Sequence, residues 1–520
     1  MRAPRRLSEL LRGIPGITTP GDTDPEITLV TADSRRVIPG ALFAALRGVR
    51  QDGHQFLREA VVRGAVAVAG EDGKAIRAVA GPPRLVRLIV PAGAGWFGRV
   101  VARAWGDPSH RLGLVGVTGT NGKTTTTHLI RAIYQAAGRS TGLLGTVSYA
   151  VGEEIRPAPH TTPDAETLQA LLAEMVARSV TDVVMEVSSH ALAQDRVAGC
   201  AFDVGVFTNL TQDHLDFHGT MDAYAAAKRR LFEALGEDNP KVRPRLAVIN
   251  RDDPRWNEMA RASGAPVWTF GLDSGADVYP ASVSSSVDGI RCRVRTPKGQ
   301  LDLTSPLIGS YNLSNLLAAT AVAVGQDVPP KAVREGIAAM IRVPGRFDKV
   351  DVGQDFTVVV DYAHTEDALR RVLAVARELC RGRLITVFGC GGDRDPGKRA
   401  PMGRVAARAS DLVILTSDNP RGEDPLAIIE AIEGGIRDEV SARPPGRPSA
   451  FSRQPYLTLP DRREAIERAV QTAEAGDLVV IAGKGHEDYQ LIGSRRLSFD
   501  DRAVAKDAIE RRLAVRAQSA

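Results

Sequence analysis

From residue 111 onward, short blocks of consecutive apolar residues alternate with stretches whose apolar positions recur at helical spacing. The block at 111–119, RLGLVGVTG, is apolar almost throughout, which is typical of a strand covered on both faces of a parallel sheet. A glycine-rich turn follows, and apolar residues between Leu129 and Ala137 then recur at helical spacing. The pattern predicts a buried strand, a tight turn and an amphipathic helix in succession.

The same alternation continues towards the end of the chain, with a long helix predicted from Glu366 and a hairpin at 289–303 around a Pro-Lys-Gly turn. Further buried strands are predicted at 182–189, 202–210, 245–250, 356–363, 383–393, 411–419 and 477–485. Strands that alternate with helices imply right-handed βαβ units and parallel sheets.

The first hundred residues contain shorter apolar runs around one helical stretch, which predicts a small α/β domain. Breaks that contain proline lie at 105–111 and 341–348, and no internal repeat is present. Because 520 residues exceed what one hydrophobic core usually serves, we expect three α/β domains in series, at 1–106, 107–342 and 343–520.

Composition narrows the class of protein. Hydrophobic residues make up 43% and charged residues 25% of the chain, as in ordinary globular proteins, and no apolar run approaches the ~20 residues that span a bilayer. The four cysteines form no CxxC pair, and the N-terminus lacks the apolar region of a secretion signal, so we expect a reducing cytoplasm. A net charge of +5 without a basic stripe gives no indication of nucleic-acid binding. The mild basic excess suits an anionic small substrate, although a solvated basic surface is the simpler explanation.

The turn at 116–130, GVTGTNGKTTTTHLI, has the order of a phosphate-binding loop. Gly119 and Gly122 allow a tight turn with inward N–H groups, Lys123 supplies a point charge, and the Thr124 hydroxyl can bind Mg²⁺ at a helix N-terminus. The strict pattern requires glycine where Val117 stands, so the match is imperfect. The alternative is a glycine-rich turn with an incidental lysine.

Other polar residues follow the predicted strands. Glu186 stands near the end of a buried strand, where parallel sheets bind ligands, so a cation is a sensible partner; a helix cap or a rim salt bridge is the alternative. From the residues alone, His214 would be a satisfied loop histidine and Lys228 a solvated lysine on a helix face. Thr161 and Thr162 precede a helix and could simply cap it.

The segment TGTNGKT at 118–124 resembles the form of this loop in the Mur ligase family, and the resemblance extends along essentially the whole chain. It implies a central P-loop-type ATPase domain between a small N-terminal domain that binds a uridine-diphosphate sugar and a Rossmann-like C-terminal domain that binds an amino acid. It also implies two Mg²⁺ ions, with ATP as a substrate. The implied metal ligands are Thr124, Glu186, His214 and Lys228, the last carbamylated to N6-carboxylysine; Lys123, Lys228, Glu186 and His214 are the implied catalytic residues.

The resemblance assigns two further groups of residues. The implied ATP-binding residues are Gly119, Thr120, Asn121, Gly122, Lys123, Thr124, Thr125, Asn312, Arg346, Asp361 and His364. The implied binding residues for the nucleotide-sugar peptide are Ser34, His54, Thr161, Thr162, Ser188 and Arg196. For Ser34 and His54 the alternative is that both are exposed loop residues. The chain departs from the family at Glu366, where proline is usual.

The stretch SDNPRGEDP at 417–425 bears on the choice of amino acid. Asn419 precedes a proline and is therefore pushed towards an extended conformation, so the loop can present Arg421 rigidly to a carboxylate. In the family, Asp-Asn-Pro-Arg marks enzymes that add meso-diaminopimelate, which has one carboxylate more than lysine. The implied binding residues are Arg394, Asp418, Asn419, Pro420, Arg421, Gly483 and Glu487. The alternative is a turn in which Arg421 makes a surface ion pair.

The resemblance therefore implies a bacterial cytoplasmic ligase of peptidoglycan precursor synthesis, which joins meso-diaminopimelate to UDP-N-acetylmuramoyl-L-alanyl-D-glutamate through an acyl phosphate. We expect small-molecule substrates, a monomer, no membrane insertion and no nucleic acid. The alternatives are a lysine-adding or folylpolyglutamate-type ligase and, in another class, a nucleotide-dependent switch ATPase.

Overall fold

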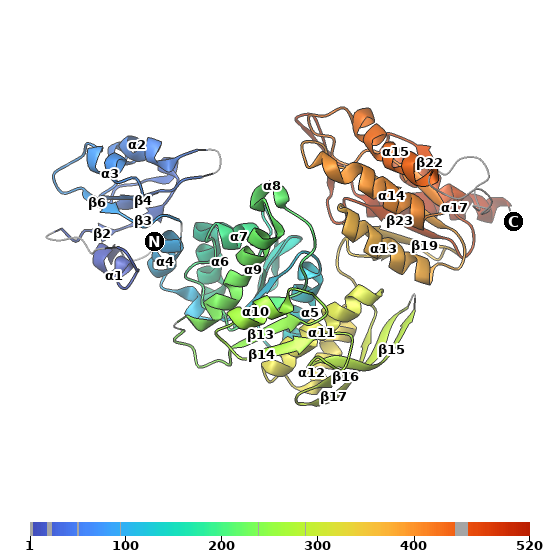
Figure 1. Ribbon diagram of the computed structural model, residues 1–520, viewed down its shortest axis with the longest axis horizontal. Coiled ribbons are helices and arrows are strands. Elements are labelled where there is room, and N and C mark those ends of the chain that lie inside the picture. The colour runs from blue at the N-terminus through green and yellow to red at the C-terminus, as the bar shows by residue number, and fades with distance from the viewer. Residues whose placement is uncertain are drawn as a thin grey trace.

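The computed structural model describes residues 4–17, 23–48, 51–93, 95–237, 239–286, 288–441 and 456–519. They form three α/β units in the predicted order, with the central unit between the other two (Figure 1). No β-sheet of the described chain joins one unit to another. Within these residues, no helix combines the length and the apolar character needed to cross a lipid bilayer.

The N-terminal unit is built on a four-stranded parallel sheet in the order β3-β4-β5-β6. Its elements are β1 (Arg5–Arg6), α1 (Leu7–Leu11), β2 (Glu26–Ile27), β3 (Leu29–Thr31), β4 (Ala41–Ala45), α2 (Leu57–Val62), β5 (Ala67–Gly70), α3 (Gly73–Ala78), β6 (Val86–Ile89) and α4 (Gly95–Ala104). Glu166 of the next unit accepts hydrogen bonds from Thr31 Oγ1, Ala32 N and Arg36, and these bonds tie the two units together.

The central unit contains an eight-stranded sheet in the order β10-β9-β8-β11-β7-β12-β13-β14, in which only β9 runs opposite to the other strands and pairs antiparallel with β8 and β10. The elements of this sheet and its covering helices are β7 (Gly113–Thr118), α5 (Lys123–Ala136), β8 (Thr141–Leu144), β9 (Ser148–Val151), β10 (Glu154–Pro157), α6 (Ala165–Ala177), β11 (Asp182–Glu186), α7 (Ser189–Ala193), β12 (Val204–Phe207), α8 (Leu215–His218), α9 (Met221–Glu233), β13 (Leu246–Asn250), α10 (Trp256–Ala262) and β14 (Val267–Phe270). The predicted strands at 182–189, 202–210 and 245–250 are confirmed as β11, β12 and β13.

A three-stranded antiparallel sheet and two helices complete the central unit. These elements are β15 (Tyr279–Ser286), β16 (Gly289–Thr296), β17 (Gly299–Ser305), α11 (Ser310–Gly325) and α12 (Pro330–Ala339). The predicted hairpin is confirmed, because β16 and β17 pair antiparallel from Ile290–Ser305 to Thr296–Gly299.

The C-terminal unit has a six-stranded sheet, β18-β19-β23-β20-β21-β22, in which only β18 is antiparallel. Its elements are β18 (Asp348–Val350), β19 (Thr357–Asp361), α13 (Glu366–Leu379), β20 (Leu384–Phe388), α14 (Arg399–Ala409), β21 (Leu412–Leu415), α15 (Pro425–Ser441), β22 (Tyr456–Thr458), α16 (Arg462–Thr472), β23 (Leu478–Ala482), β24 (Tyr489–Ile492), β25 (Arg495–Ser498) and α17 (Asp501–Ser519). The helix predicted from Glu366 is confirmed.

Each main sheet separates two apolar clusters, one on each face. On β7, Val115 and Val117 pack on the side of α5, whereas Leu114 packs on the opposite side, as alternation along a strand requires. Two apolar contacts of the described chain cross the unit boundaries: Ile308 and Tyr311, near the start of α11, pack against the apolar cluster of the C-terminal unit, and Ala165 of α6 packs in a cluster of the N-terminal unit. Each unit therefore has its own core, and a small apolar contact joins the central unit to the C-terminal one.

Candidate active site

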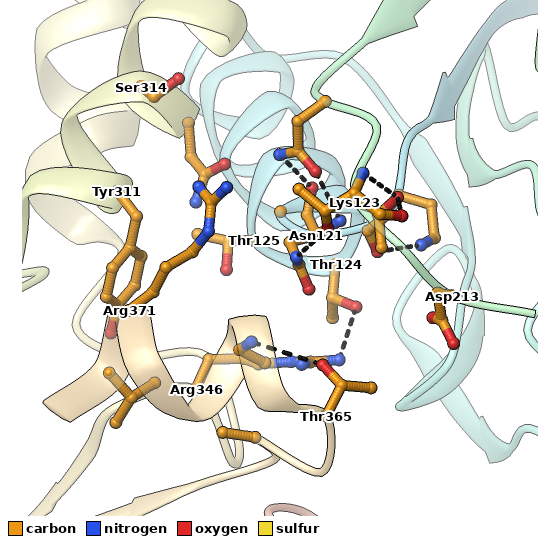
Figure 2. Close-up of a pocket in the computed structure, with 18 of the residues that line it drawn as sticks. Asn121, Lys123, Thr124, Thr125, Asp213, Tyr311, Ser314, Arg346, Thr365 and Arg371 are labelled. Carbon is orange, nitrogen blue, oxygen red and sulfur yellow. Dashed lines mark hydrogen bonds between the residues drawn. The ribbon is translucent and has the colours of Figure 1, made fainter. Parts of the chain in front are cut away.

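A cavity of about 740 Å³ lies where the central and C-terminal units meet (Figure 2). Its central-unit wall comprises the loop 120–125, residues that follow the carboxyl ends of β8, β11, β12 and β13, and the start of α11. Its other wall is formed by Arg346, by residues 361–365 after β19 and by one face of α13. The carboxyl ends of parallel strands are where open α/β sheets bind ligands, so this is the principal candidate site.

The loop between β7 and α5 depends on glycine at two positions. Gly122, the residue that precedes α5, has φ +87°, and a Cβ there would lie 2.4 Å from Asn315 Oδ1. Gly119 has φ +148°, and a Cβ there would lie 1.8 Å from Thr208 Oγ1. The backbone therefore turns closely against β12 and α11 and presents the N-terminus of α5 to the cavity, as a phosphate site requires.

Lys123 folds back over this loop. Its Nζ donates to the carbonyl oxygens of Gly119 and Thr120, each at 2.9 Å. Burial lowers the pKa of Lys123, while the nearby Glu186 and Asp213 carboxylates act in the opposite direction. An incoming phosphate would offer this ammonium an anionic acceptor in place of two neutral carbonyls.

Lys228 lies on the inner side of α9, where its side chain is 1% exposed. Its Nζ donates to Gly119 O at 2.8 Å and lies 4.3 Å from the centre of the Tyr224 ring. Burial and the neighbouring Lys123 hold the pKa of Lys228 well below its ordinary value. The alternative of a solvated lysine is wrong: this amine is buried beside the phosphate-loop candidate, where its uncharged form is favoured.

Glu186 ends β11 and lines the cavity with 1% of its surface exposed. Its Oε1 accepts from Thr146 N at 2.8 Å and its Oε2 from Thr146 Oγ1 at 3.0 Å, so neither a helix cap nor a salt bridge accounts for it. Thr161 Oγ1 lies 3.0 Å from Thr146 Oγ1 and extends this polar wall.

His214 has φ +54° and follows Asp213, and both residues line the cavity. The His214 ring is 43% exposed, lies 3.4 Å from Asp213 Oδ2 and meets the His190 ring edge to face. Partial desolvation beside the cavity lowers the pKa of His214, which favours the neutral ring with an available lone pair.

Thr162, Ser188 and Arg196 form one hydrogen-bonded group beside Glu186. Thr162 Oγ1 donates to Glu186 O at 2.9 Å and accepts from Ser188 N at 3.0 Å, while Arg196 donates to Thr162 O at 3.1 Å. The cap of α6 is Asp164, which accepts from Thr167 N, so the alternative of Thr161 and Thr162 as that helix's cap is wrong.

Arg346, Asp361 and His364, three residues of the C-terminal unit for which the resemblance implies ATP binding, line this cavity. Arg346 donates to Thr124 Oγ1 at 3.3 Å (Figure 2). Its guanidinium lies 4.8 Å from the centre of the Tyr362 ring. Asp361 is buried, which raises its pKa, and it accepts from Phe347 N and Ala363 N. His364 lines the cavity, and burial lowers its pKa.

Asn312 occupies a different place from Asn315. Asn312 Nδ2 donates to Ile308 O at 2.7 Å and its Oδ1 accepts from Asn315, so its amide is used within α11, and it does not line the cavity. Asn315 does line the cavity and also accepts from Thr126 Oγ1. The helical spacing of the two residues identified the right helix face but did not separate these roles.

Three residues at or beside the cavity were not identified from the sequence: Asp367, Arg371 and Tyr311. Asn121 Nδ2 donates to Asp367 Oδ2 at 3.3 Å across the junction, and Asp367 also accepts from Arg371 Nε at 2.8 Å. Arg371 and Tyr311 extend along the cavity wall near Thr125 (Figure 2). No motif singles these residues out; helical spacing places Arg371 on α13 but does not show that α13 faces α5.

Ser34 and His54 lie in the N-terminal unit and do not line the cavity. Both are buried, so the alternative of exposed loop residues is wrong. Ser34 Oγ donates to Glu59 at 3.0 Å, His54 Nδ1 lies 2.6 Å from Asp52 Oδ1, and His54 Nε2 accepts from Asp72 N. Their hydrogen bonds in this structure are thus made within their own unit.

A second polar cluster lies at the carboxyl ends of β20, β21 and β23. Arg421 has φ +52°, donates to Gly392 O at 2.8 Å and is held at its backbone by Leu491 O and Gly493 N. The described structure records no ion pair for Arg421, so the alternative of a surface salt bridge is not supported. The guanidinium is fixed by its loop rather than by an opposite charge.

The other residues predicted for amino-acid binding lie close to Arg421 or to one another in this second cluster. Asn419 Nδ2 donates to Glu487 Oε2 at 2.8 Å, and Pro420 joins Asn419 to Arg421. A Cβ on Gly483 would lie 2.5 Å from Asp418 Oδ2, and one on Gly391 would lie 2.9 Å from Arg421 and 3.9 Å from Arg394. All seven residues predicted for amino-acid binding thus surround three neighbouring strand ends.

The donor set of the first cavity suits Mg²⁺, which prefers oxygen ligands. Glu186, Asp213 and Thr124 supply oxygen atoms to its lining. No three His, Cys, Asp or Glu side chains in the described ranges are gathered into a preformed metal site. As an ammonium Lys228 would repel a cation, whereas as a carbamate it would add an anionic oxygen ligand.

Three segments of the chain match domains of one family: residues 26–92 match "Mur ligase family, catalytic domain", residues 117–323 the "Mur ligase middle domain", and residues 345–485 the "Mur ligase, glutamate ligase domain". The chain belongs to the Mur ligase family.

Relatives within the family match along nearly the full chain. The UDP-N-acetylmuramoyl-L-alanyl-D-glutamate–2,6-diaminopimelate ligase of Geobacillus kaustophilus is 44% identical over 98% of this chain and 100% of its own length. That of Geobacter metallireducens is 48% identical over 96% and 97%. A solved structure of a ligase of this name has a TM-score of 0.65 at 34% identity, and covers 94% of this chain and 96% of its own.

Proposed function

We propose that this Mur ligase is the ATP-dependent enzyme that joins meso-2,6-diaminopimelate to UDP-N-acetylmuramoyl-L-alanyl-D-glutamate, a step of peptidoglycan precursor synthesis. The observation that carries the proposal is the pairing of a phosphate-loop cavity with a separate cluster of Arg394, Asn419, Arg421 and Glu487 at neighbouring strand ends. The first suits activation of an acid, and the second suits recognition of a zwitterionic amine.

In this proposal ATP occupies the 740 Å³ cavity. The residues 119–125 surround its phosphates, and the Lys123 ammonium leaves the carbonyls of Gly119 and Thr120 for the terminal phosphoryl group. Arg346, Asp361 and His364 contribute from the C-terminal wall. Asn315 replaces Asn312 as the α11 side chain that faces the nucleotide, because Asn312 is used within the helix.

Thr124, Glu186, His214 and a carbamylated Lys228 would hold two Mg²⁺ ions, which would supply neutralisation of phosphate charge. Carbamylation requires an uncharged amine to attack CO₂. The burial of Lys228 next to Lys123 favours that uncharged form, and the product anion would then be compensated by Lys123. The electrostatic surroundings of Lys228 therefore support this modification.

The nucleotide-sugar peptide would extend from the N-terminal unit to the cavity. Ser34 and His54 are proposed for the uridine-diphosphate end. Thr161, Thr162, Ser188 and Arg196 are proposed for the peptide end, next to Glu186. The Thr162 hydroxyl and the Arg196 guanidinium are already held by neighbours, so this wall is ordered before a ligand arrives.

The diamino acid would bind at Arg394, Asp418, Asn419, Pro420, Arg421, Gly483 and Glu487. A guanidinium presented by a fixed loop suits the second carboxylate, the group that lysine lacks. Lysine would leave this guanidinium without its anionic partner, which is a strong basis for rejection. This argument favours diaminopimelate over a lysine-adding role.

The chemistry follows from the poor electrophilicity of a carboxylate. The γ-carboxylate of the D-glutamyl residue attacks the terminal phosphorus of ATP, which gives an acyl phosphate and ADP. The free amine of diaminopimelate then attacks the acyl carbon, and the tetrahedral intermediate loses inorganic phosphate and a proton to give the amide. The chain's own contribution is to position the reactants and to balance charge through Lys123 and Arg346.

The test is phosphate release by the purified protein with ATP, the nucleotide-sugar dipeptide and a panel of amino acids. We expect turnover that requires both the dipeptide and meso-diaminopimelate. Preference for lysine or for a pteroylglutamate acceptor would indicate another ligase of the family. ATP turnover that needs no amine would indicate a switch ATPase.

A further inference from the structure

Lys484 follows Gly483 at the carboxyl end of β23 and is 0% exposed. Its ammonium has three neighbours: Asn419 Oδ1 at 3.2 Å, Glu487 Oε2 at 3.2 Å and the Tyr489 ring centre at 5.3 Å. Burying an ammonium is unfavourable unless its partners compensate for the lost water. Here the two hydrogen-bond partners are both residues of the proposed amino-acid site.

A second buried lysine shows the contrast. Lys241 in the central unit donates to the backbone carbonyls of Leu112 and Ala201 as well as to Asp203 Oδ2. Its hydrogen bonds join neighbouring segments of the main chain, so this lysine stabilises the fold of the central unit. For Lys484 the described structure records no backbone acceptor, so its charge acts on side chains that face the ligand site.

Lys484, Asn419 and Glu487 form a closed triangle of hydrogen bonds. Asn419 Nδ2 donates to the same Glu487 Oε2 at 2.8 Å, and Leu491 N donates to Asn419 Oδ1 at 2.8 Å, which fixes the orientation of the amide. Both hydrogen bonds recorded for the Glu487 carboxylate within the described chain end on Oε2. Its Oε1 is therefore left to accept from an incoming ammonium.

We infer that Lys484 is a positioning residue that holds Asn419 and Glu487 ready for the ammonium-bearing end of the diamino acid, an inference that rests on the proposed function. Without Lys484, Glu487 Oε2 would keep a single hydrogen bond, from Asn419 Nδ2, and Asn419 Oδ1 would keep only the one from Leu491 N. Both side chains would therefore lose part of what fixes their orientation towards the ligand site.

The test is steady-state kinetics of Lys484→Met with each substrate varied in turn. We expect KM for meso-diaminopimelate to rise about 10- to 100-fold, as expected for loss of charged hydrogen bonds, with the KM values for ATP and the nucleotide-sugar dipeptide within about twofold of wild type. Lys484→Gln, which keeps a donor without the charge, should lie between wild type and Lys484→Met. Lys241→Met is the matched control, and we expect it to lower the unfolding temperature without a selective change in KM for the diamino acid.

A double-mutant cycle separates positioning from general stability. If Lys484 acts through Glu487, Lys484→Met in a Glu487→Gln background should raise KM for the diamino acid little further. Additive effects, or equal changes in all three KM values for both Lys484 variants, would overturn the inference. Wild-type protein without diaminopimelate-dependent turnover would overturn the proposed function as well, whereas an active wild type with an unaltered Lys484→Met would overturn this inference alone.

Discussion

The ammonium groups of Lys123 and Lys228 share one acceptor, the carbonyl oxygen of Gly119, at 2.9 and 2.8 Å. Two like charges this close are unfavourable, and burial together with this proximity lowers the pKa of Lys228. A phosphate would draw Lys123 away, and conversion of Lys228 to an anion would remove the repulsion. The charge states of the two lysines are therefore coupled to each other and to any phosphate that binds at the loop.

Lys228→Ala should reduce turnover by at least about 100-fold, because the proposed carbamate would be lost together with its cation-binding oxygen atoms. Added short-chain carboxylates should restore part of the activity, as measured by phosphate release. Arg229→Ala, which removes an exposed ion pair with Glu233 on the same helix, is the control and should leave turnover near wild type. Full activity in Lys228→Ala would remove the carbamate proposal.

Gly122→Ala should raise KM for ATP at least about tenfold, because the new Cβ meets Asn315 Oδ1 at 2.4 Å and the residue has φ +87°. Gly138→Ala is a matched control: its φ is +76°, but a Cβ there has no atom within 4 Å. It should cost stability through backbone strain alone and leave KM for ATP unchanged. The same KM in both variants would contradict a phosphate role for the loop.

Arg421→Ala should raise KM for meso-diaminopimelate about 10- to 100-fold, the range expected for losing charged hydrogen bonds, while ATP binding changes little. Discrimination against lysine should shrink, because the site would no longer contain the guanidinium that lysine leaves unpaired. The measurements are KM for each amino acid and nucleotide binding by calorimetry. An equal loss of amino-acid and ATP binding would refute the assigned role.

His486 should make the C-terminal unit less stable in acid. Burial lowers the pKa of this ring from 6.5 to about 4, and its Nδ1 has no hydrogen-bond partner. Between these values the unfolded chain binds more protons than the folded one, so the free energy of unfolding falls as pH drops from about 6.5 towards 4, by up to about 3 kcal/mol. In His486→Gln this part of the pH dependence should disappear from denaturant unfolding curves. If the free energy of unfolding of His486→Gln depended on pH as in wild type, the assignment to His486 would be contradicted.

The two walls of the cavity should approach each other when ligands bind. Asn121–Asp367 and Thr124–Arg346 are polar contacts across the junction, and both involve the phosphate-loop candidate. We expect small-angle scattering to show a smaller radius of gyration with an ATP analogue and the nucleotide-sugar dipeptide than without them. The same radius in both conditions would count against closure.

Much of the fold follows from the sequence pattern, because apolar blocks such as 111–119 and 477–485 have one physical solution in an α/β unit: a strand buried on both faces. The position of Glu186 beside the phosphate loop was also predictable in outline. A carboxylate that ends a parallel strand must lie at the ligand-binding edge, and β11 is paired with β7.

Other relationships depend on tertiary packing that local pattern does not encode. The burial of Lys228 requires α9 to face the phosphate loop, and nothing in the helical spacing of YAAAKRR determines that. Asn312 and Asn315 are equivalent by spacing, yet only one lines the cavity, since Ile308 O is within reach of the other. Nothing in the sequence pattern distinguishes Lys484, and only the structure places its ammonium between Asn419 and Glu487. The domain limits at 106/107 and 342/343 stay a prediction.

The separate cores of the central and C-terminal units have a consequence for how such enzymes diversify. The apparatus proposed to activate the acid is built mainly on one sheet, and the side chains proposed to choose the amine stand on loops of another, after β20, β21 and β23. Grafting those three loops from a homologue could therefore redirect the choice of incoming amine while the phosphoryl-transfer half stays intact. In this architecture, the loops that select the amine nucleophile can change in sequence without matching changes in the residues that activate the acid.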